Sequence, residues 1–180
     1  MPLPVLATKP LTNSARVSSF LAAGEESPRQ SDTTCLVRDP AATDAVIEQA
    51  YRQIYFHAFK VDRDAVLESQ LRSGQISTRD FIRQLLLSEK FQRDFYRCNS
   101  NYRVVEQVVG RVFGRPVHGQ AEQIAWSIVI AEQGLPKFVD ALLNSDEYRD
   151  NFGDNLVPFQ RSRVLPGQAV GTMPFNQQAP

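Results

Sequence analysis

The sequence predicts an all-α protein, in which a compact multi-helix domain, residues 41–157, lies between two extended segments. These are an N-terminal arm, residues 1–40, and a C-terminal tail, residues 158–180. Two observations lead to this prediction. Apolar residues recur with the 3.6-residue period of a helix through most of the central region. One helical pattern also occurs twice, 57 positions apart, which indicates an internal duplication.

The first two helices are predicted from apolar spacing and from residues that cap helix ends. AATDAVIEQAYRQIYFHAF becomes helical from Thr43, because its apolar residues recur at helical spacing. A second helix, DRDAVLESQLRSG, should have Asp62 as its N-cap and should stop at Gly74. One side of this second helix would carry Val66, Leu67, Gln70 and Leu71.

The next three helices each start at a polar residue that can cap them. Residues 77–80 open a third helix, and Ser88 is placed to cap a short fourth one that ends near Phe95. Asn99 or Ser100 opens a fifth helix. Valine is a mediocre helix former, but the valines of this segment are spaced helically and do not alternate, which favours a helix over a strand.

The remaining helices are separated by a glycine. AEQIAWSIVIAEQG predicts a sixth helix that stops at Gly134. LPKFVDALLN and SDEYRDNF predict the seventh and the eighth. After Val157 the periodicity ends, and four prolines and two glycines follow, which is typical of an extended tail.

The duplicated pattern is clearest when FIRQLLLSEKFQRDF, residues 81–95, is laid over FVDALLNSDEYRDNF, residues 138–152. The Phe, the Leu-Leu pair, the Ser and the two aromatic residues then coincide. Each half also begins with a long helix, since Ile54-Tyr55 aligns with Val112-Phe113 at a shift of 58. The alternative, that two amphipathic helices match by coincidence, stays open at the level of the sequence.

The N-terminal arm, the two cysteines and the lengths of the apolar runs indicate the environment in which the protein works. The arm contains five prolines among scattered apolar residues and should become ordered only on another surface. Cys35 and Cys98 form no CxxC motif, and no signal peptide precedes them, so a reducing compartment is expected. No apolar run approaches the 18 or so residues that would span a bilayer, and no membrane span is therefore predicted.

Charge is balanced overall but unevenly distributed. Lys and Arg number 20 and Asp and Glu number 20, which gives no general attraction to nucleic acid. Residues 52–115 carry twelve basic against seven acidic side chains, whereas residues 116–157 carry two against seven. Such a chain is suited to docking through different sides, although a solvated surface with uneven charge is an equally good reading.

Residues that could support catalysis or bind a metal do not converge in the sequence. His57 and His118 are 61 positions apart, and neither cysteine has a neighbour that would activate it. Asp146, Glu147, Asp150 and Asp154 are placed where carboxylates favour a helix N-terminus and solvate a surface. No phosphate-binding, nucleophile-elbow or zinc-protease motif is present. We therefore expect neither an enzyme nor a metal site.

Aromatic and arginine side chains suited to binding another protein are abundant. Rings are concentrated between Tyr51 and Tyr102, with arginines interleaved among them. Most of these rings should belong to the core, and the remainder would provide anchors for a protein surface or a stacked planar ligand.

Several blocks of the chain closely resemble one known family, across about residues 45–167. They include AYRQIYFHAF, LESQLRSGQISTRDFIRQLLLSEKFQRDFY, NYRVVEQVVGRVFGRPV and FVDALLNSDEYRDNFGDNLVPFQRSRVLPG. These blocks resemble the phycobilisome linker polypeptide domain. The resemblance implies a non-catalytic protein in the central cavity of stacked phycocyanin hexamers. It also implies no cofactor of its own and a position close to phycocyanobilin-type bilins carried by partner subunits.

MPLPVL at the start, the arm with Pro28-Arg29 and the VPFQRSR block look most like a rod–core linker. The implied partners are phycocyanin α/β hexamers, the allophycocyanin core and other linkers, on the cytoplasmic or plastid stromal face of the thylakoid. Two features depart from the family, namely the neutral net charge and a tail that ends at Pro180, where the family usually continues with a core-binding portion. The photosystem-associated variant of the family ends in a hydrophobic anchor, and the lack of one in this sequence argues against that variant. A rod–rod linker, or a repeat of the core-membrane linker, is the alternative. A bilin lyase has no support in the sequence.

The predicted contact residues follow from this resemblance and from their side-chain chemistry. Arg161 and Arg163 should meet acidic biliprotein surfaces, and aromatic and arginine side chains near bilins should shift the energies of the pigments. The full set is Phe20, Tyr51, Arg52, Tyr55, Phe59, Arg93, Tyr96, Arg97, Arg103, Phe159, Arg161 and Arg163.

Overall fold

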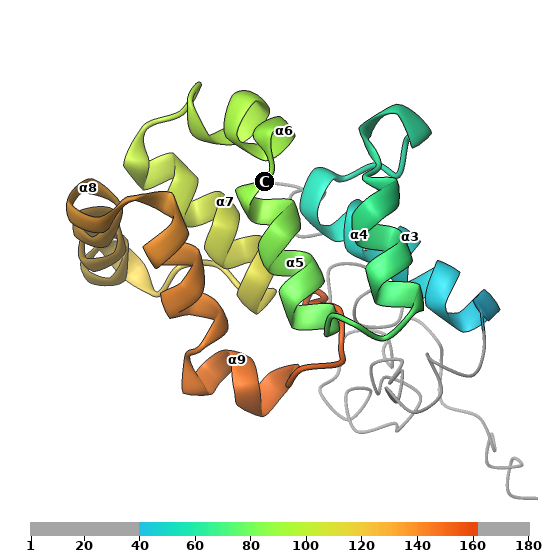
Figure 1. The fold of residues 1–180 in the computed structure, drawn as a ribbon. Coiled ribbons are helices and arrows are strands. Elements are labelled where there is room, and N and C mark those ends of the chain that lie inside the picture. The colour runs from blue at the N-terminus through green and yellow to red at the C-terminus, as the bar shows by residue number, and fades with distance from the viewer. Residues whose placement is uncertain (1–39, 162–180) are drawn as a thin grey trace, which may run out of the picture.

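The computed structural model describes residues 40–161, and this region is helical without strands (Figure 1). The first half of the domain consists of α3 (Pro40–Tyr55), the 3-10 turn η3 (Lys60–Asp62), α4 (Ala65–Arg72), α5 (Thr78–Leu87), α6 (Glu89–Phe91) and the π-helical turn η4 (Gln92–Tyr96). The second half consists of α7 (Asn101–Phe113), α8 (Gly119–Leu143) and α9 (Asp146–Asn151). The all-α prediction is therefore confirmed for the described residues.

Most predicted helix starts are confirmed by hydrogen bonds from their capping side chains. Ser77 accepts from the backbone N–H of Asp80, Ser88 from that of Phe91, Ser100 from that of Arg103 and Ser145 from that of Tyr148. Each cap satisfies one of the backbone donors that a helix N-terminus leaves free. The local sequence thus defines where these helices begin.

The predicted break at Gly134 is also confirmed. Gly134 has φ 79° and ψ 174° in the middle of α8, so two helical segments meet there at a kink. Glycine adopts a positive φ at little cost, which is why the chain can turn at this position and redirect residues 135–143 toward α5.

The prediction for the second helix needs two corrections. Its N-cap is Asp64, whose carboxylate accepts from the N–H groups of Val66 and Leu67, while the N–H of Asp64 donates to the hydroxyl of Tyr51. Asp62 lies in η3 and pairs with Lys90 at 3.1 Å. Val66, expected on the packed side, is 65% exposed, because α4 turns Leu71 toward the core instead.

The core lies between the halves and is built from both copies of the repeated pattern. Phe81, Leu85, Phe138 and Leu142 are all at most 1% exposed. They belong to α5 and to the second segment of α8, and α5 lies at the centre of the molecule (Figure 1). Burial of such side chains stabilises the fold by about 1.5–3 kcal/mol each.

The sequence repeat corresponds to a repeat of local geometry. Ser88 and Ser145 have φ/ψ of −60°/153° and −66°/151°, and each donates its hydroxyl at 2.7 Å to the carbonyl three residues earlier. Equivalent residues of the two halves also touch each other. Arg83 binds Asp140, 57 positions on, and Gln53 donates to the carbonyl of Arg111, 58 positions on. Contacts between equivalent residues arise where two copies face each other about a two-fold axis.

Three predictions fall wholly or partly outside the described residues, namely the N-terminal arm, the C-terminal tail and the environment of Cys35. Packing continues through residue 161, four residues beyond the predicted end of the domain, because Val157 and Gln160 are buried. Among the described helices, none is long and apolar enough to span a bilayer.

The two equivalent caps offer a matched test of the repeat. Ser145→Ala should lower the free energy of unfolding by about 1 kcal/mol, the usual cost of removing an N-cap hydroxyl. Ser88→Ala should cost more, because the Ser88 hydroxyl also lies 2.6 Å from the Tyr55 hydroxyl, and the aligned residue in the second half is a phenylalanine. Urea unfolding followed by circular dichroism measures both, with Ser127→Ala as control. Equal losses at 88 and 145 would contradict this account.

Candidate interaction surface

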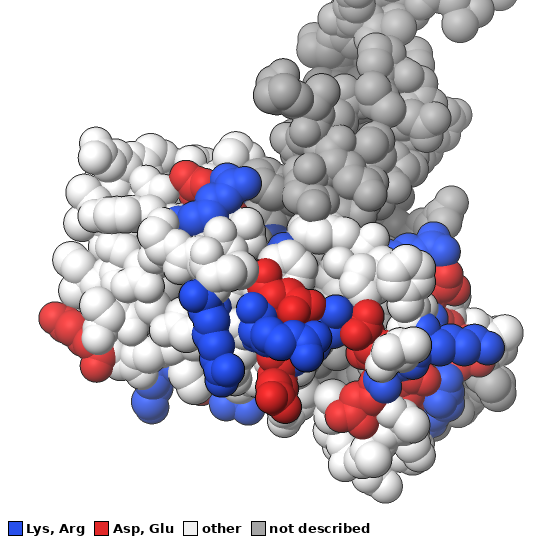
Figure 2. All heavy atoms as spheres, turned by 90° about the horizontal axis from the view of Figure 1, so that it is seen from above, with Lys and Arg blue, Asp and Glu red and all other residues white. Residues whose placement is uncertain are grey.

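The loop around η3 exposes Phe59 and Val61, and η4 with its C-terminal end exposes Arg93 and Arg97. Seen from above in Figure 2, charged side chains cluster over this region, whereas the surface over α8 is mostly uncharged. Lys90 holds the region together, because its ammonium lies 3.1 Å from a carboxylate oxygen of Asp62 and 2.8 Å from one of Asp94. We call the exposed residues Phe59, Val61, Arg93 and Arg97 the basic-aromatic surface.

The Arg93 side chain is held through its Nε atom, while much of the side chain is exposed to solvent. Its Nε donates to Asp94 at 2.9 Å, and two-thirds of its side chain is exposed. Lys90 and then Arg93 lower the pKa of the Asp94 carboxyl, which stays ionised at neutral pH. Arg97 is exposed and forms no ion pair within residues 40–161. Both guanidinium groups are therefore accessible to an acidic partner.

The loop around η3 presents apolar side chains to solvent. Phe59 is 66% exposed and stacks on His57 with 4.5 Å between ring centroids, and Val61 is 95% exposed. Phe56, at the start of this loop, has φ 66°. A positive φ is uncommon outside glycine and costs conformational energy, so packing of the Phe56 ring must hold the loop in this form.

The other predicted arginines within the described residues, like Arg93, each pair with a carboxylate of this chain. Arg52 pairs with Glu48, and Arg103 pairs with Glu106 at 2.8 Å, although both arginine side chains are more than half exposed. Arg161 lies 3.2 Å from Glu147, with 30% of its side chain exposed. Phe20 and Arg163 lie outside the described residues.

Four predicted aromatic residues are packed against this chain to different degrees. Tyr51 and Tyr55 are 1% and 3% exposed, so they belong to the core and are withdrawn as contact residues. Burial raises the pKa of the Tyr51 hydroxyl to about 12. Tyr96 and Phe159 are partly buried, and the ring of Phe159 packs edge-on against Phe152. The rings of Tyr51 and Tyr55 face inward because they belong to the apolar side of α3 that packs on the core.

The segment after α9 is held against the end of α7. The N–H of Arg161 donates to the carbonyl of Gly114 at 2.9 Å. Gly114 has φ 64°, and a Cβ atom there would lie 1.9 Å from the backbone oxygen of Phe159. Only glycine is compatible with so close an approach of two backbone segments. The direction in which the chain leaves the domain is thereby fixed.

Arg115 reinforces this junction. Its guanidinium donates to both carboxylate oxygens of Glu122, at 2.9 and 3.1 Å, and to both of Glu147, at 2.6 Å each. The hydrogen bond from Arg115 lowers the pKa of Glu147. Burial alone would raise the pKa of Glu122, but the bonds from Arg115 and from the His118 backbone lower it overall. Arg161 adds a second cation to Glu147.

Arg111 is the functional group that the sequence interpretation missed. It is 1% exposed, and its guanidinium carbon lies 4.0 Å from the ring centroid of Phe95, 4.4 Å from that of Phe56 and 5.2 Å from that of Phe91. Its Nε and one Nη have no hydrogen-bond partner within the described residues. Burial, and next the charge of Arg103, lowers its pKa to about 9. The sequence signal was its place on the apolar stripe, seven positions after Val104.

No group of three or more His, Cys, Asp or Glu side chains within residues 40–161 could hold a metal ion. The exposed side chains of Arg93, Arg97, Phe59 and Val61 are accessible to solvent, and the ring contacts of the buried Arg111 include Phe56 at the start of the η3 loop.

Replacing Arg115 tests the junction and its pH dependence. Arg115→Met should lower the free energy of unfolding by about 2 kcal/mol at pH 7, because two partly buried carboxylates lose their cation. The folded-state pKa of Glu122 and Glu147 is lowered from 4.5, so this stabilisation is present above pH 4.5 and is lost as the pH falls through the folded values. The difference between wild type and variant should shrink in acid. Arg149→Met, at an exposed pair of 3.9 Å, is the control.

Replacing Arg111 tests whether its dehydration outweighs its ring contacts. Arg111→Met should leave the free energy of unfolding at pH 7 unchanged or raise it by up to about 2 kcal/mol, because no carboxylate offsets the buried charge. The folded state releases this proton near pH 9, earlier than the unfolded state, so any advantage of the variant should diminish by pH 10. Arg103→Met is the exposed control on the same helix. A loss of more than about 2 kcal/mol would show that the cation–π contacts dominate.

Comparison with known proteins identifies the family. The phycobilisome linker polypeptide model matches residues 38–161. The phycobilisome rod-core linker polypeptide cpcG of Pyropia yezoensis is 46% identical, over 100% of this chain and 78% of that protein. The photosystem I-associated linker protein CpcL of Synechocystis is 44% identical, over 97% and 71%. The phycobilisome rod-core linker polypeptide CpcG1 of Thermosynechococcus vestitus is 48% identical, over 98% and 62%. The chain belongs to the phycobilisome linker polypeptide family.

Proposed function

We propose that this protein is a non-catalytic rod–core linker of the phycobilisome, which ties phycocyanin rods to the allophycocyanin core. The observation that carries the proposal is the similarity to relatives named rod-core linkers, which extends over the whole chain at 43–46% identity. The similarity includes the segments outside residues 40–161, so it is not limited to the helical domain.

The arrangement of charge supports docking between unlike neighbours. Residues 52–115, which include the basic-aromatic surface, carry twelve basic against seven acidic side chains, and residues 116–157 carry two against seven. Unlike charge on two segments of one chain would direct each segment to a different partner surface and disfavour the reverse orientation. In our proposal the domain occupies the cavity of a phycocyanin hexamer, with Arg93, Arg97 and Phe59 toward acidic biliprotein surfaces.

The proposal extends to the pigments. The protein would have no chromophore of its own, and its exposed arginine and aromatic side chains would lie near bilins of the partner subunits. A fixed guanidinium beside a conjugated pigment changes the relative energy of its ground and excited states. Energy transfer toward the core would then be directed in part by this chain. The assembly would be peripheral to the thylakoid, on its cytoplasmic or stromal face.

One observation favours a second candidate, a linker between phycocyanin rods and photosystem I. The photosystem I-associated linker protein CpcL of Synechocystis is nearly as similar as the rod-core linkers are. The two candidates share the rod end and differ in the second partner. A rod–rod linker, or a repeat of the core-membrane linker, would require only biliprotein discs on both sides.

Reconstitution distinguishes these functions. The full chain is mixed with linker-free phycocyanin hexamers, then with allophycocyanin or with photosystem I, and complexes are separated on sucrose gradients. The proposal predicts that phycocyanin and allophycocyanin sediment together only when the chain is present, with energy transfer between them seen in fluorescence. Co-sedimentation of photosystem I instead would favour the second candidate, and phycocyanin alone would favour a rod–rod linker. No binding to phycocyanin would refute the linker role.

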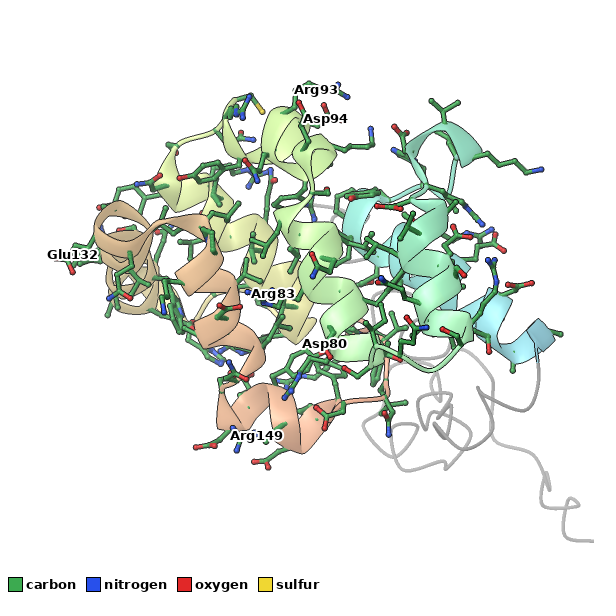
Figure 3. The ribbon with its side chains drawn as sticks, viewed as in Figure 1. Asp80, Arg83, Arg93, Asp94, Glu132 and Arg149 are labelled. Atoms are coloured by element: carbon green, nitrogen blue, oxygen red, sulfur yellow. The ribbon has the colours of Figure 1, made fainter. Side chains whose placement is uncertain are left out.

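Charge reversal tests the basic-aromatic surface. Arg93→Glu with Arg97→Glu should weaken binding to phycocyanin by about tenfold or more, because two accessible cations become anions facing acidic groups. Arg149→Glu changes an exposed arginine on α9, on the opposite side of the molecule in Figure 3, and should have little effect. Equal losses in both variants would mean that the effect is one of net charge.

A further inference from the structure

The first segment of α8 exposes an apolar helix face that no other described element covers. Ile124 and Ile128 are 38% and 48% exposed, and Ala121, Ala125 and Glu132 are also exposed. These positions follow the spacing i, i+3, i+4, i+7 and i+11, so they share one face of the helix. We call these five residues the α8 face.

The opposite side of the same helix segment accounts for its attachment to the domain. Ile130 is buried, Trp126 packs edge-on against Phe138 at 5.6 Å between ring centroids, and Gln123 donates to Glu106. The helix is thus anchored without using the α8 face. The second helix of the first half, α4, exposes one large apolar residue, Val66, and buries Leu71, whereas the first segment of α8 exposes two isoleucines one helical turn apart.

The composition of the α8 face indicates what would cover it. Ala121 at one end of the face and Ala125 near its centre would allow another helix to approach closely, since interaxial distances of about 8–10 Å depend on the side chains at the contact. An apolar stripe with this spacing is what an amphipathic partner helix packs against. The face extends from Ala121 to Glu132, about three helical turns, which suits a single partner helix.

The charge at the edge of the α8 face indicates the charge that a partner helix should carry. Glu132 points outward from α8 in Figure 3 and forms no ion pair within residues 40–161. No Lys or Arg occurs between Arg115 and Lys137. A second copy of this chain would offer the same acidic-rimmed face and would leave Glu132 without a cation. A partner helix with Lys or Arg beside its apolar stripe would complement the face in both charge and shape.

We infer that the α8 face is a docking site for an amphipathic helix of phycocyanin whose apolar stripe is flanked by basic side chains. This inference rests on the proposed function, because it takes phycocyanin as the partner. It assigns that partner a second contact, on a face that differs from the basic-aromatic surface in both apolar content and charge.

Replacing each of two exposed alanines by glutamate tests the apolar contact. Ala125→Glu places a charge at the centre of the α8 face, whereas Ala141→Glu places the same charge on an exposed position of the second segment of α8. Titration of the full-length variants with linker-free phycocyanin hexamers should show affinity reduced about tenfold or more for Ala125→Glu and less than about twofold for Ala141→Glu. Circular dichroism and thermal unfolding, expected to match wild type, show that both variants fold.

Charge reversal at the rim tests the predicted basic flank. Glu132→Lys should weaken phycocyanin binding about threefold or more at low salt, with the loss diminishing as salt screens the pair, whereas Asp150→Lys on α9 should not. Binding unaffected by Ala125→Glu, or self-association of the chain that Ala125→Glu abolishes, would overturn the inference and leave the linker role intact. Failure of wild type to bind phycocyanin would overturn the proposed function as well.

Discussion

The contact between α5 and the second segment of α8 is the interaction on which the other packing depends. It buries Phe81 and Leu85 against Phe138 and Leu142, so each copy of the repeated pattern supplies the surface that the other needs. Neither α5, with 10 residues, nor the segment after Gly134 would be stable alone in water, because short helices gain their stability from packing. Arg83, labelled on α5 in Figure 3, donates two hydrogen bonds to the carboxylate of Asp140 at the edge of this contact. Arg83 lowers the pKa of Asp140, so the pair stays charged well below neutral pH.

Arg111 connects the second half of the domain to the first through a buried positive charge. Its guanidinium contacts rings from the loop after α3, from α6 and from η4, and its own helix is α7. One buried cation therefore touches three separate segments of the first half from the second half. An apolar residue could fill the space, but only a flat cation can bind three phenyl rings through their faces. Phe56, held at φ 66°, is one of the three rings, so the Arg111 contacts also constrain the loop that exposes Phe59 and Val61.

Much of the fold could be predicted from the sequence because the relevant signals are local. The serine caps at 77, 88 and 145 and the glycine at 134 act within one helical turn and lie where helices were predicted to begin or break. Of the two predicted candidates for the start of α7, Asn99 and Ser100, the cap is Ser100. Predictions that depend on tertiary contacts were less accurate than those that depend on local sequence. Asp62 and Asp64 are equally good caps by sequence, and the choice depends on the Tyr51 hydroxyl that binds the Asp64 backbone. Tyr51 and Tyr55 were expected at a surface since aromatic composition alone does not show which rings face inward. Arg111 was overlooked because arginine is almost never fully buried without a partner.

The two halves share an interior pattern but have unlike surfaces. Side chains that are buried in the core are constrained by packing, and Phe81 and Phe138, Leu85 and Leu142, and the capping serines are alike. Residues that point outward are under no such constraint. The first half carries Arg93 and Arg97 on α6–η4 and an apolar tip at η3, and the second half carries the isoleucines and Glu132 of α8. A protein that joins two different neighbours needs two unlike surfaces on a rigid core. If the two surfaces were alike, both would bind the same neighbour. The divergence of the two exteriors on a common interior is therefore the structural property that suits this chain to linking.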